Sequence, residues 1–254
     1  MKELFEKRIN RLKKLLGSLH EALLVTNEVN IGYFTGFFHS EGALLVTQNS
    51  ATLLVDFRYF EAAQQKSSGC EVVCFEKLSI IVLNILTAES IDAVLVETGH
   101  MTLARFNSFK EKLAEHNIEI ISNDRLDKRI GDIRVIKDKT ELDKIATAQK
   151  IAEQGYLEML NYLKPGVSER EISARLEFEM KLRGAEDISF SLITITGKKT
   201  SLPHGVPSDD IVREGDFFTC DFGAMYDGYH SDTTRTVAIG SATDKMREIY
   251  DIVL

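Results

Sequence analysis

Hydrophobic positions follow one pattern up to residue 122 and another beyond it. In the first part, short apolar runs alternate with segments whose apolar residues recur every three or four positions, which predicts strands alternating with helices. Strands are predicted at 22–26, 43–47, 52–56, 71–75, 93–97 and 118–122, and helices at 1–20, 58–66, 79–88 and 103–116. This alternation is typical of an α/β layer around a largely buried sheet.

The second part of the sequence predicts helices first and antiparallel strands after them. A polar, charge-rich segment at 123–139 is the expected boundary between the two parts. A capping box formed by Ser168 and Glu171 marks the start of one helix. Helices are predicted at 139–163, 168–183 and 244–254, and strands at 189–196, 217–222 and 230–238.

A hairpin is indicated within this second part by Asp227-Gly228, a dipeptide typical of two-residue turns, between two strand-like runs. If these two residues form the loop, Tyr226 pairs with Tyr229 and the register of both strands is fixed. The register decides which side chains share a face of the hairpin, because side chains alternate between faces along a strand.

Two carboxylates share one face in that register. Asp221 pairs with Thr234, and Asp232 lies on the cross-strand diagonal from Asp221, with the two backbones roughly 7 Å apart at these residues. Carboxylates this close repel each other unless a cation lies between them, and hard oxygen ligands favour ions such as Mn²⁺. A solvated surface pair is the alternative. Apolar neighbours predict a buried hairpin, however, in which unpaired carboxylates are costly, so we expect half of a metal site.

Composition narrows the class of protein. A net charge of −8 without a basic stripe argues against a nucleic-acid partner, and no apolar stretch is long enough to span a bilayer. The N-terminus lacks the apolar core of a signal peptide. Cys70, Cys74 and Cys220 have no zinc-type spacing, and we interpret them as buried free thiols in a reducing compartment. These features predict a cytoplasmic protein with no nucleic-acid or membrane partner.

His204 is a further candidate, in a loop between two predicted strands. Pro203, Gly205 and Pro207 surround it and restrict the shape of the loop. Functional groups are often carried on loops that a rigid scaffold supports, and an imidazole there could donate a hydrogen bond or shuttle a proton. A single histidine is more often structural, so both interpretations stay open at this point.

An ordered set of motifs resembles the creatinase/aminopeptidase, or pita-bread, family, and within it the Xaa-Pro peptidases prolidase and aminopeptidase P. In the second part these are Leu-Pro-His-Gly at 202–205, Gly-Asp at 215–216, Asp-Phe-Gly-Ala at 221–224 and Ser-Asp-x-Thr-Arg-Thr at 231–236. The segments at 30–36, 56–59 and 134–141 resemble the N-terminal domain of that family and the entry to its catalytic domain. The resemblance implies a creatinase-like α/β domain at 1–128 followed by an α+β pita-bread catalytic domain at 135–254, apparently truncated.

The resemblance also implies residue roles. Asp221 matches an aspartate that chelates one metal ion, and Asp232 matches one that bridges two. Thr234 matches a threonine just behind these ligands. His204 matches a histidine that contacts the substrate and stabilises the transition state. Phe190 matches an aromatic residue that lines the substrate pocket, with a place in the core as the alternative.

The implied activity is metal-dependent hydrolysis of the bond before proline, in Xaa-Pro dipeptides or at peptide N-termini, by a hydroxide that bridges two divalent ions. Manganese is the first choice, with cobalt or zinc as alternatives, and a cytoplasmic homodimer acting on proline-containing peptides is expected. His230 shares the face of Asp232 by strand parity, but the family pattern gives it no role.

The family site also needs a histidine and two glutamates, which would follow residue 254, so we expect a truncated catalytic domain. Half of such a domain would expose apolar surface and would therefore associate with itself. Two alternatives stay open. One is creatinase-like or methionine aminopeptidase-like hydrolysis on the same fold. The other is a catalytically incomplete homologue that binds peptides or proteins.

Overall fold

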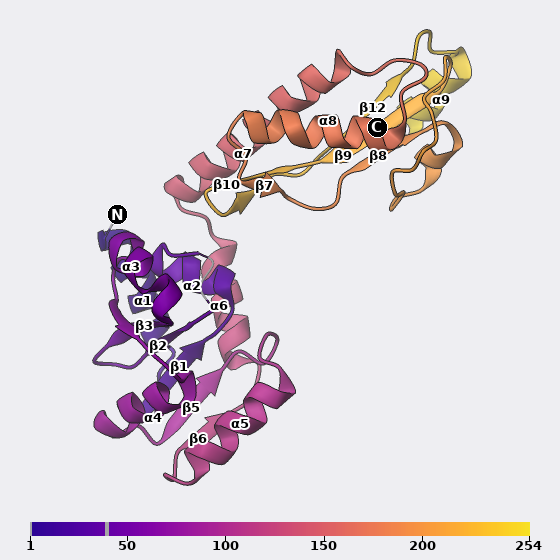
Figure 1. Cartoon of the computed structure of the whole chain (residues 1–254). Coiled ribbons are helices and arrows are strands. Elements are labelled where there is room, and N and C mark those ends of the chain that lie inside the picture. Colours follow the sequence, from indigo (N-terminus) through magenta and orange to yellow (C-terminus); the bar gives the residue numbers. More distant parts are fainter. Residues whose placement is uncertain (1, 39–40) are drawn as a thin grey trace. The chain divides into compact units, whose positions relative to one another are not determined.

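The computed structural model describes residues 2–38 and 41–254, which form two compact units, Met1–Ile136 and Lys137–Leu254 (Figure 1). Each unit has its own strands and its own buried core. As the sequence predicts, the first unit alternates strands and helices, and the second places helices before antiparallel strands.

One sheet organises the first unit. Among the described residues its strand order is β4-β3-β2-β1-β5-β6, and β2 alone runs antiparallel to its neighbours. The strands are β1 (Glu21–Val25), β2 (Ala43–Val46), β3 (Ala51–Val55), β4 (Glu71–Cys74), β5 (Ala93–Val96) and β6 (Glu119–Ile121). The central strands are buried on both faces, which is why the sequence shows them as continuous apolar runs.

Helices cover both faces of this sheet. α1, α2, α3 and α6 pack on the face that carries Leu23 and Val25, and α4 and α5 pack on the face that carries Ala22 and Leu24. The helices named here are α1 (Lys2–Lys13), α2 (Glu28–Thr35), α3 (Phe57–Lys66), α4 (Leu78–Ala88), α5 (Leu103–Ala114) and α6 (Arg125–Val135). The result is a three-layer α/β arrangement.

α2 is a helix that the sequence pattern did not reveal. All residues from Ile31 to Thr35 are buried, so beyond its exposed first turn this helix has no polar face and no amphipathic period. The side chain of Asn27 caps its start, and Gly36 ends it at a positive φ of 78°. The buried carboxylate of Glu97 accepts hydrogen bonds from the backbone N–H of Thr26 and Asn27 at 2.5 and 2.8 Å, which holds the chain at the entry to α2.

One prediction about the first unit was wrong, and another needs a structural refinement. The helix expected at 1–20 ends at Lys13, and Met1, with which it was expected to begin, lies outside the described residues. The predicted boundary segment 123–139 does contain the division between the units, but most of it is the helix α6, which buries Leu126, Ile130 and Ile133 in the core. The abundant charges of this segment obscured its helical spacing, and the first unit extends to Ile136 rather than 128.

The second unit begins with two helices, α7 (Lys139–Leu160) and α8 (Glu169–Leu182), which pack against its antiparallel strands. α8 starts with the predicted capping box, in which Ser168 and Glu171 satisfy each other's backbone N–H groups. The helices supply one side of a core whose other side is formed by alternate residues of the strands.

The strands of this unit form two three-stranded sheets, of order β11-β10-β7 and β12-β9-β8. They are β7 (Asp187–Ile188), β8 (Ile193–Thr196), β9 (Phe217–Phe222), β10 (Ala224–Tyr226), β11 (Tyr229–His230) and β12 (Thr233–Ala238). The pairs Tyr226–Tyr229 and Asp221–Thr234 confirm the predicted register. The single strand expected at 189–196 was wrong, because the chain passes from one sheet to the other within that segment.

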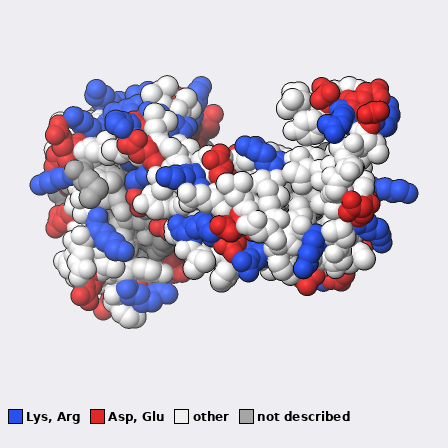
Figure 2. All heavy atoms as spheres, turned by 90° about the horizontal axis from the view of Figure 1, so that it is seen from above, with Lys and Arg blue, Asp and Glu red and all other residues white. Residues whose placement is uncertain are grey.

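α9 (Asp244–Val253) completes the described chain and has no buried residue. Several of its apolar side chains are exposed, namely Ile249, Tyr250, Ile252, Val253 and, at its end, Leu254. No helix within residues 2–38 and 41–254 is long and apolar enough to cross a membrane. On the face drawn in Figure 2, basic and acidic side chains lie interspersed.

The prediction that all three cysteines are buried free thiols is confirmed only in part. Cys220 is buried, Cys70 is half-buried and Cys74 is exposed, and all three are free thiols. Cys74 is exposed because it ends β4, an edge strand of the sheet. Burial raises the pKa of Cys70 to about 11 and that of Cys220 further still. Both thiols therefore stay protonated at neutral pH and are weak nucleophiles.

Replacing Phe222 with Ala tests the core that supports the hairpin. Phe222 is fully buried and stacks on Tyr156 of α7, with ring centroids 5.0 Å apart. We expect Phe222→Ala to lower the free energy of unfolding by about 3–5 kcal/mol, because it leaves a cavity between α7 and β9. Chemical denaturation measures the change. As a control, Leu157→Ala alters an exposed residue next to Tyr156 and should change stability by less than about 0.5 kcal/mol.

Candidate active site

β9 places Asp221 on the face of the sheet that α7 and α8 do not cover. Its even-numbered residues Phe218, Cys220 and Phe222 are buried in the core, so Asp221 projects to the opposite side and is half-buried. Thr234, its partner on β12, donates a hydrogen bond from Oγ1 to Asp221 Oδ1 at 2.6 Å. Within the described residues, Oδ2 of Asp221 has no hydrogen-bond or ion-pair partner and is free to bind a ligand.

Asp232 lies between β11 and β12 and is exposed. Its neighbours Ser231 and Thr233 are both buried; Ser231 accepts from the N–H of Ala224 at 3.0 Å, and Thr233 exchanges hydrogen bonds with Gln149 of α7. These contacts hold the backbone on both sides of Asp232 and direct its own side chain the other way. The carboxylate itself makes no hydrogen bond or ion pair to residues 2–38 or 41–254.

The expectation that both carboxylates are buried was wrong. The apolar residues that suggested a buried hairpin occupy its core face, whereas Asp221 is half-buried and Asp232 is exposed on the other. The cost of desolvation therefore gives no reason to expect a cation between these two carboxylates. What remains is an open pair of carboxylates whose free oxygens suit a hard divalent cation.

Gly223 is the point at which this hairpin changes sheets. It separates β9 from β10, and the carbonyl oxygen of Ser231 lies 1.9 Å from the place where a Cβ atom of residue 223 would be. Only glycine permits so close an approach of two backbones. Gly223 also accepts, through its carbonyl, a hydrogen bond from the N–H of Ser189 at 2.9 Å.

His204 follows the short 3₁₀ helix η1 (Gly197–Ser201), in the loop between β8 and β9. The next residue, Gly205, sits on Ile195, whose Cδ1 lies 2.7 Å from the ideal Cβ position of residue 205. Ile195 pairs with Thr219 and therefore shares the face of Asp221. The loop thus covers part of that face. The imidazole of His204 is exposed and makes no hydrogen bond to the described residues.

Phe190 stands next to Ser189, which donates hydrogen bonds to the carbonyl groups of Gly223 and Ala224. It is half-buried and does not belong to the core clusters of the described residues. The structure thus joins Asp221 and Thr234 by a hydrogen bond and holds Phe190 near the sheet junction through its neighbour. It records no direct contact of His204, Asp232 or Phe190 with that pair.

The described residues hold no group of three or more histidine, cysteine, aspartate or glutamate side chains that could bind a metal ion. Asp221 and Asp232 fit the part of a carboxylate site that they would supply, since their oxygens are free of cationic partners. Further ligands would be needed to complete the coordination of a divalent ion.

A buried ion pair that the sequence pattern does not reveal lies beside the His204 loop. Glu169, the first residue of α8, is fully buried and pairs with Lys199 of η1. An acidic residue in the first turn of a helix normally faces water, where it interacts favourably with the helix dipole. The position of Glu169 in the sequence therefore gives no sign that it is buried or has a basic partner.

Comparisons with known proteins identify the family of this chain. The model of metallopeptidase family M24 matches residues 143–254, and that of the creatinase/prolidase N-terminal domain matches residues 8–134. The chain is 35% identical to the uncharacterized peptidase YqhT of Bacillus subtilis, covering 97% of this chain and 69% of the relative. The chain belongs to metallopeptidase family M24.

Other M24 relatives include proteins with named activities. The chain is 34% identical to the Xaa-Pro dipeptidase of Pyrococcus furiosus, over 96% of this chain and 69% of that protein. Its structure matches an Xaa-Pro dipeptidase from Bacillus anthracis with a TM-score of 0.90 at 34% identity, covering 98% and 69% of the two chains. This M24 chain therefore spans about 69% of the length of these relatives and has their pita-bread fold.

Replacing Gly223 with Ala tests the close approach at the sheet junction. A Cβ atom there would collide with the backbone of Ser231, so the strands on both sides must shift. We expect a loss of at least about 2–3 kcal/mol in the free energy of unfolding. As a control, Gly131→Ala lies on α6 with open space around its Cβ position and should be neutral or stabilise slightly. Equal stability of Gly223→Ala and the wild type would contradict this interpretation.

Proposed function

We propose that the protein is a metal-dependent peptidase that hydrolyses the peptide bond preceding proline, in Xaa-Pro dipeptides or at peptide N-termini. The observation that carries the proposal is the Asp221–Thr234 hydrogen bond, which leaves one carboxylate oxygen free on a face that the His204 loop partly covers. Xaa-Pro dipeptidases among the M24 relatives support the choice of substrate. In this proposal the first unit, Met1–Ile136, is a non-catalytic domain, and the second unit, Lys137–Leu254, carries catalytic residues.

Asp221 and Asp232 would bind two divalent ions, together with ligands that the described residues do not supply. When bound, such ions act as Lewis acids and supply an activated water at neutral pH. The hydroxyl of Thr234 occupies one oxygen of Asp221, so it fixes the plane of the carboxylate and aims the other oxygen at a ligand. Manganese is our first choice of metal, because carboxylates are hard ligands, with cobalt or zinc as alternatives.

His204 would act on the substrate. Its imidazole has no partner among the described residues, so it can donate a hydrogen bond to the carbonyl oxygen as negative charge develops there. A donor placed in this way commonly lowers the barrier by roughly 3–4 kcal/mol. Phe190 would offer an apolar surface to the proline ring. A bond before proline has no N–H, so recognition must depend on such apolar contacts rather than on that donor.

A second candidate function is peptide binding without hydrolysis. It is favoured by the fact that the described residues contain no cluster of three or more metal-ligating side chains. Calorimetric titration with Mn²⁺ separates the two, because a binding module needs no affinity for divalent ions. The main proposal also includes a cytoplasmic location and a homodimer. Light scattering of the purified protein measures its oligomeric state directly.

Replacing His204 with Ala should lower kcat for an Xaa-Pro dipeptide by about 10²–10³-fold in the presence of Mn²⁺, with little change in bound metal. Asp221→Asn should reduce both metal binding and activity, since it removes a charged ligand. His230→Ala is the matched control, because His230 is an exposed histidine like His204 but lies on the hairpin and has no assigned role.

Steady-state kinetics and metal analysis of the three variants decide the matter. An equal loss in His230→Ala and His204→Ala would contradict the role of His204. Failure of the full-length wild-type protein with Mn²⁺ or Co²⁺ to cleave both Xaa-Pro dipeptides and longer Xaa-Pro peptides would contradict the proposed reaction.

A further inference from the structure

A fully buried carboxylate lies at the base of the His204 loop. The side chain of Glu169 is completely shielded from solvent at the first residue of α8. Its Oε1 accepts a hydrogen bond from the N–H of Thr196 at 2.8 Å, and its Oε2 accepts from the N–H of Ser208 at 2.9 Å and from Lys199 Nζ at 2.5 Å. A buried carboxylate is tolerated only when it is paired and hydrogen-bonded as fully as this.

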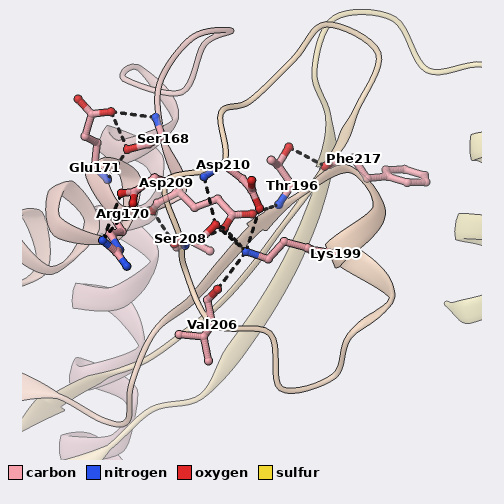
Figure 3. Close-up of polar contacts among 12 residues, drawn as sticks. Ser168, Arg170, Glu171, Thr196, Lys199, Val206, Ser208, Asp209, Asp210 and Phe217 are labelled. Atoms are coloured by element: carbon pink, nitrogen blue, oxygen red, sulfur yellow. Dashed lines mark hydrogen bonds and ion pairs between the residues drawn. The ribbon is translucent and has the colours of Figure 1, made fainter.

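These partners lie on both sides of one loop. Thr196 ends β8 and Lys199 belongs to η1, before His204, whereas Ser208 follows it (Figure 3). One carboxylate therefore ties together the two ends of the segment 197–207. We name Glu169, Lys199 and Ser208 the loop clasp.

Lys199 extends the clasp towards the middle of the loop. Its ammonium group also donates to the carbonyl of Val206 at 3.1 Å and to Ser208 Oγ at 2.9 Å, and it pairs with Asp210 at 3.4 Å. The contact with Val206 lies two residues beyond His204. Several hydrogen bonds that share one buried ion pair confine the loop more firmly than separate surface contacts would.

The charged groups in and around the clasp stabilise one another. Burial alone would lower the pKa of Lys199, but the hydrogen bond and charge of Glu169, and then those of Asp210, raise it above its usual value. Ser208 and Lys199 hold the pKa of Asp210 below its usual range. The first turn of α8 adds a favourable interaction with the negative charge of Glu169. Lys199 and Asp210 therefore stay ionised across the neutral pH range.

We propose that Glu169 and Lys199 are positioning residues, which hold His204 in place for reaction by clasping both ends of its loop to α8. This inference rests on the proposed function of His204. The clasp fixes the two ends of the loop, and Gly205 seats its middle on Ile195, on the face that carries Asp221. Positioning of this kind matters because displacement of a catalytic group by about 1 Å can cost roughly 10²-fold in rate.

Glu169→Gln tests the clasp, because its amide places a donor against the donors of Lys199 and Ser208. We expect hydrogen exchange of the amides in 197–207 to accelerate by about tenfold or more while the amides of α7 stay protected. With Mn²⁺ and an Xaa-Pro dipeptide, kcat should fall about 10–100-fold, with little change in KM or bound metal.

A double-mutant cycle separates positioning from general stability. In a His204→Ala background, Glu169→Gln should reduce kcat by less than about twofold, because the clasp acts through His204. A structural defect would reduce activity equally in both backgrounds and would overturn the proposal. Arg170→Gln is the matched control: it breaks only the exposed ion pair with Asp209, next to Glu169, and should leave exchange and kcat unchanged.

A second pair of variants covers the case in which Glu169→Gln fails to fold. Lys199→Met should free the loop, whereas Lys199→Arg keeps the charge and should restore most of the protection and activity. Unchanged exchange of 197–207 in Lys199→Met overturns the clasp. If the wild-type protein shows no peptidase activity, the proposed function fails, and the exchange measurements alone still decide whether the clasp holds the loop.

Discussion

The strict alternation of side chains across β9 is the constraint on which the second unit depends. Every second residue from Phe218 to Phe222 enters the core against α7 and α8, and this packing commits the residues between them to the open face. Asp221 is on that face because its neighbours are apolar. Stability and chemistry are thus assigned to opposite sides of one strand, and the hydrogen bond from Thr234 then orients the carboxylate that the alternation has exposed.

A second constraint acts through buried carboxylates at helix starts. Glu169 at the start of α8 and Glu97 near the start of α2 each accept several hydrogen bonds from backbone groups that no regular structure would otherwise satisfy. Each unit therefore holds an irregular segment in place with a carboxyl group that is inaccessible to water. In the second unit that segment carries His204, so the arrangement links the fold to the proposed chemistry.

The sequence predicted those features that depend on local patterns. Asp227-Gly228 determined the hairpin register, and Ser168 with Glu171 identified the start of α8, because a turn and a cap depend on neighbouring residues alone. α2 was missed because burial on all sides removes the amphipathic signal, and α6 because its charged residues outnumber its three buried ones. The partnership of Glu169 and Lys199 joins residues thirty positions apart, and no local pattern encodes such a contact.

The same limit applies to the exposure of the carboxylates. Apolar residues around Asp221 and Asp232 indicated burial of the hairpin correctly, but burial of one face says nothing about the other. Knowledge of the whole sheet, including which face α7 and α8 cover, was needed to place both aspartates on the open side. Family resemblance named these residues, whereas tertiary packing determined how accessible they are.

The contact at Gly223 has a consequence for how the strands find their partners during folding. A shift of the hairpin by one residue would turn the carboxylates into the core. A shift by two would leave each side chain on its own face but would replace Gly223 by a residue with a Cβ atom. That atom would lie only 1.9 Å from the carbonyl oxygen of Ser231, which is too close for two unbonded atoms. The lack of a side chain at Gly223 therefore helps to select the correct strand register, because it disfavours the two-residue shift that the alternation of side chains would allow.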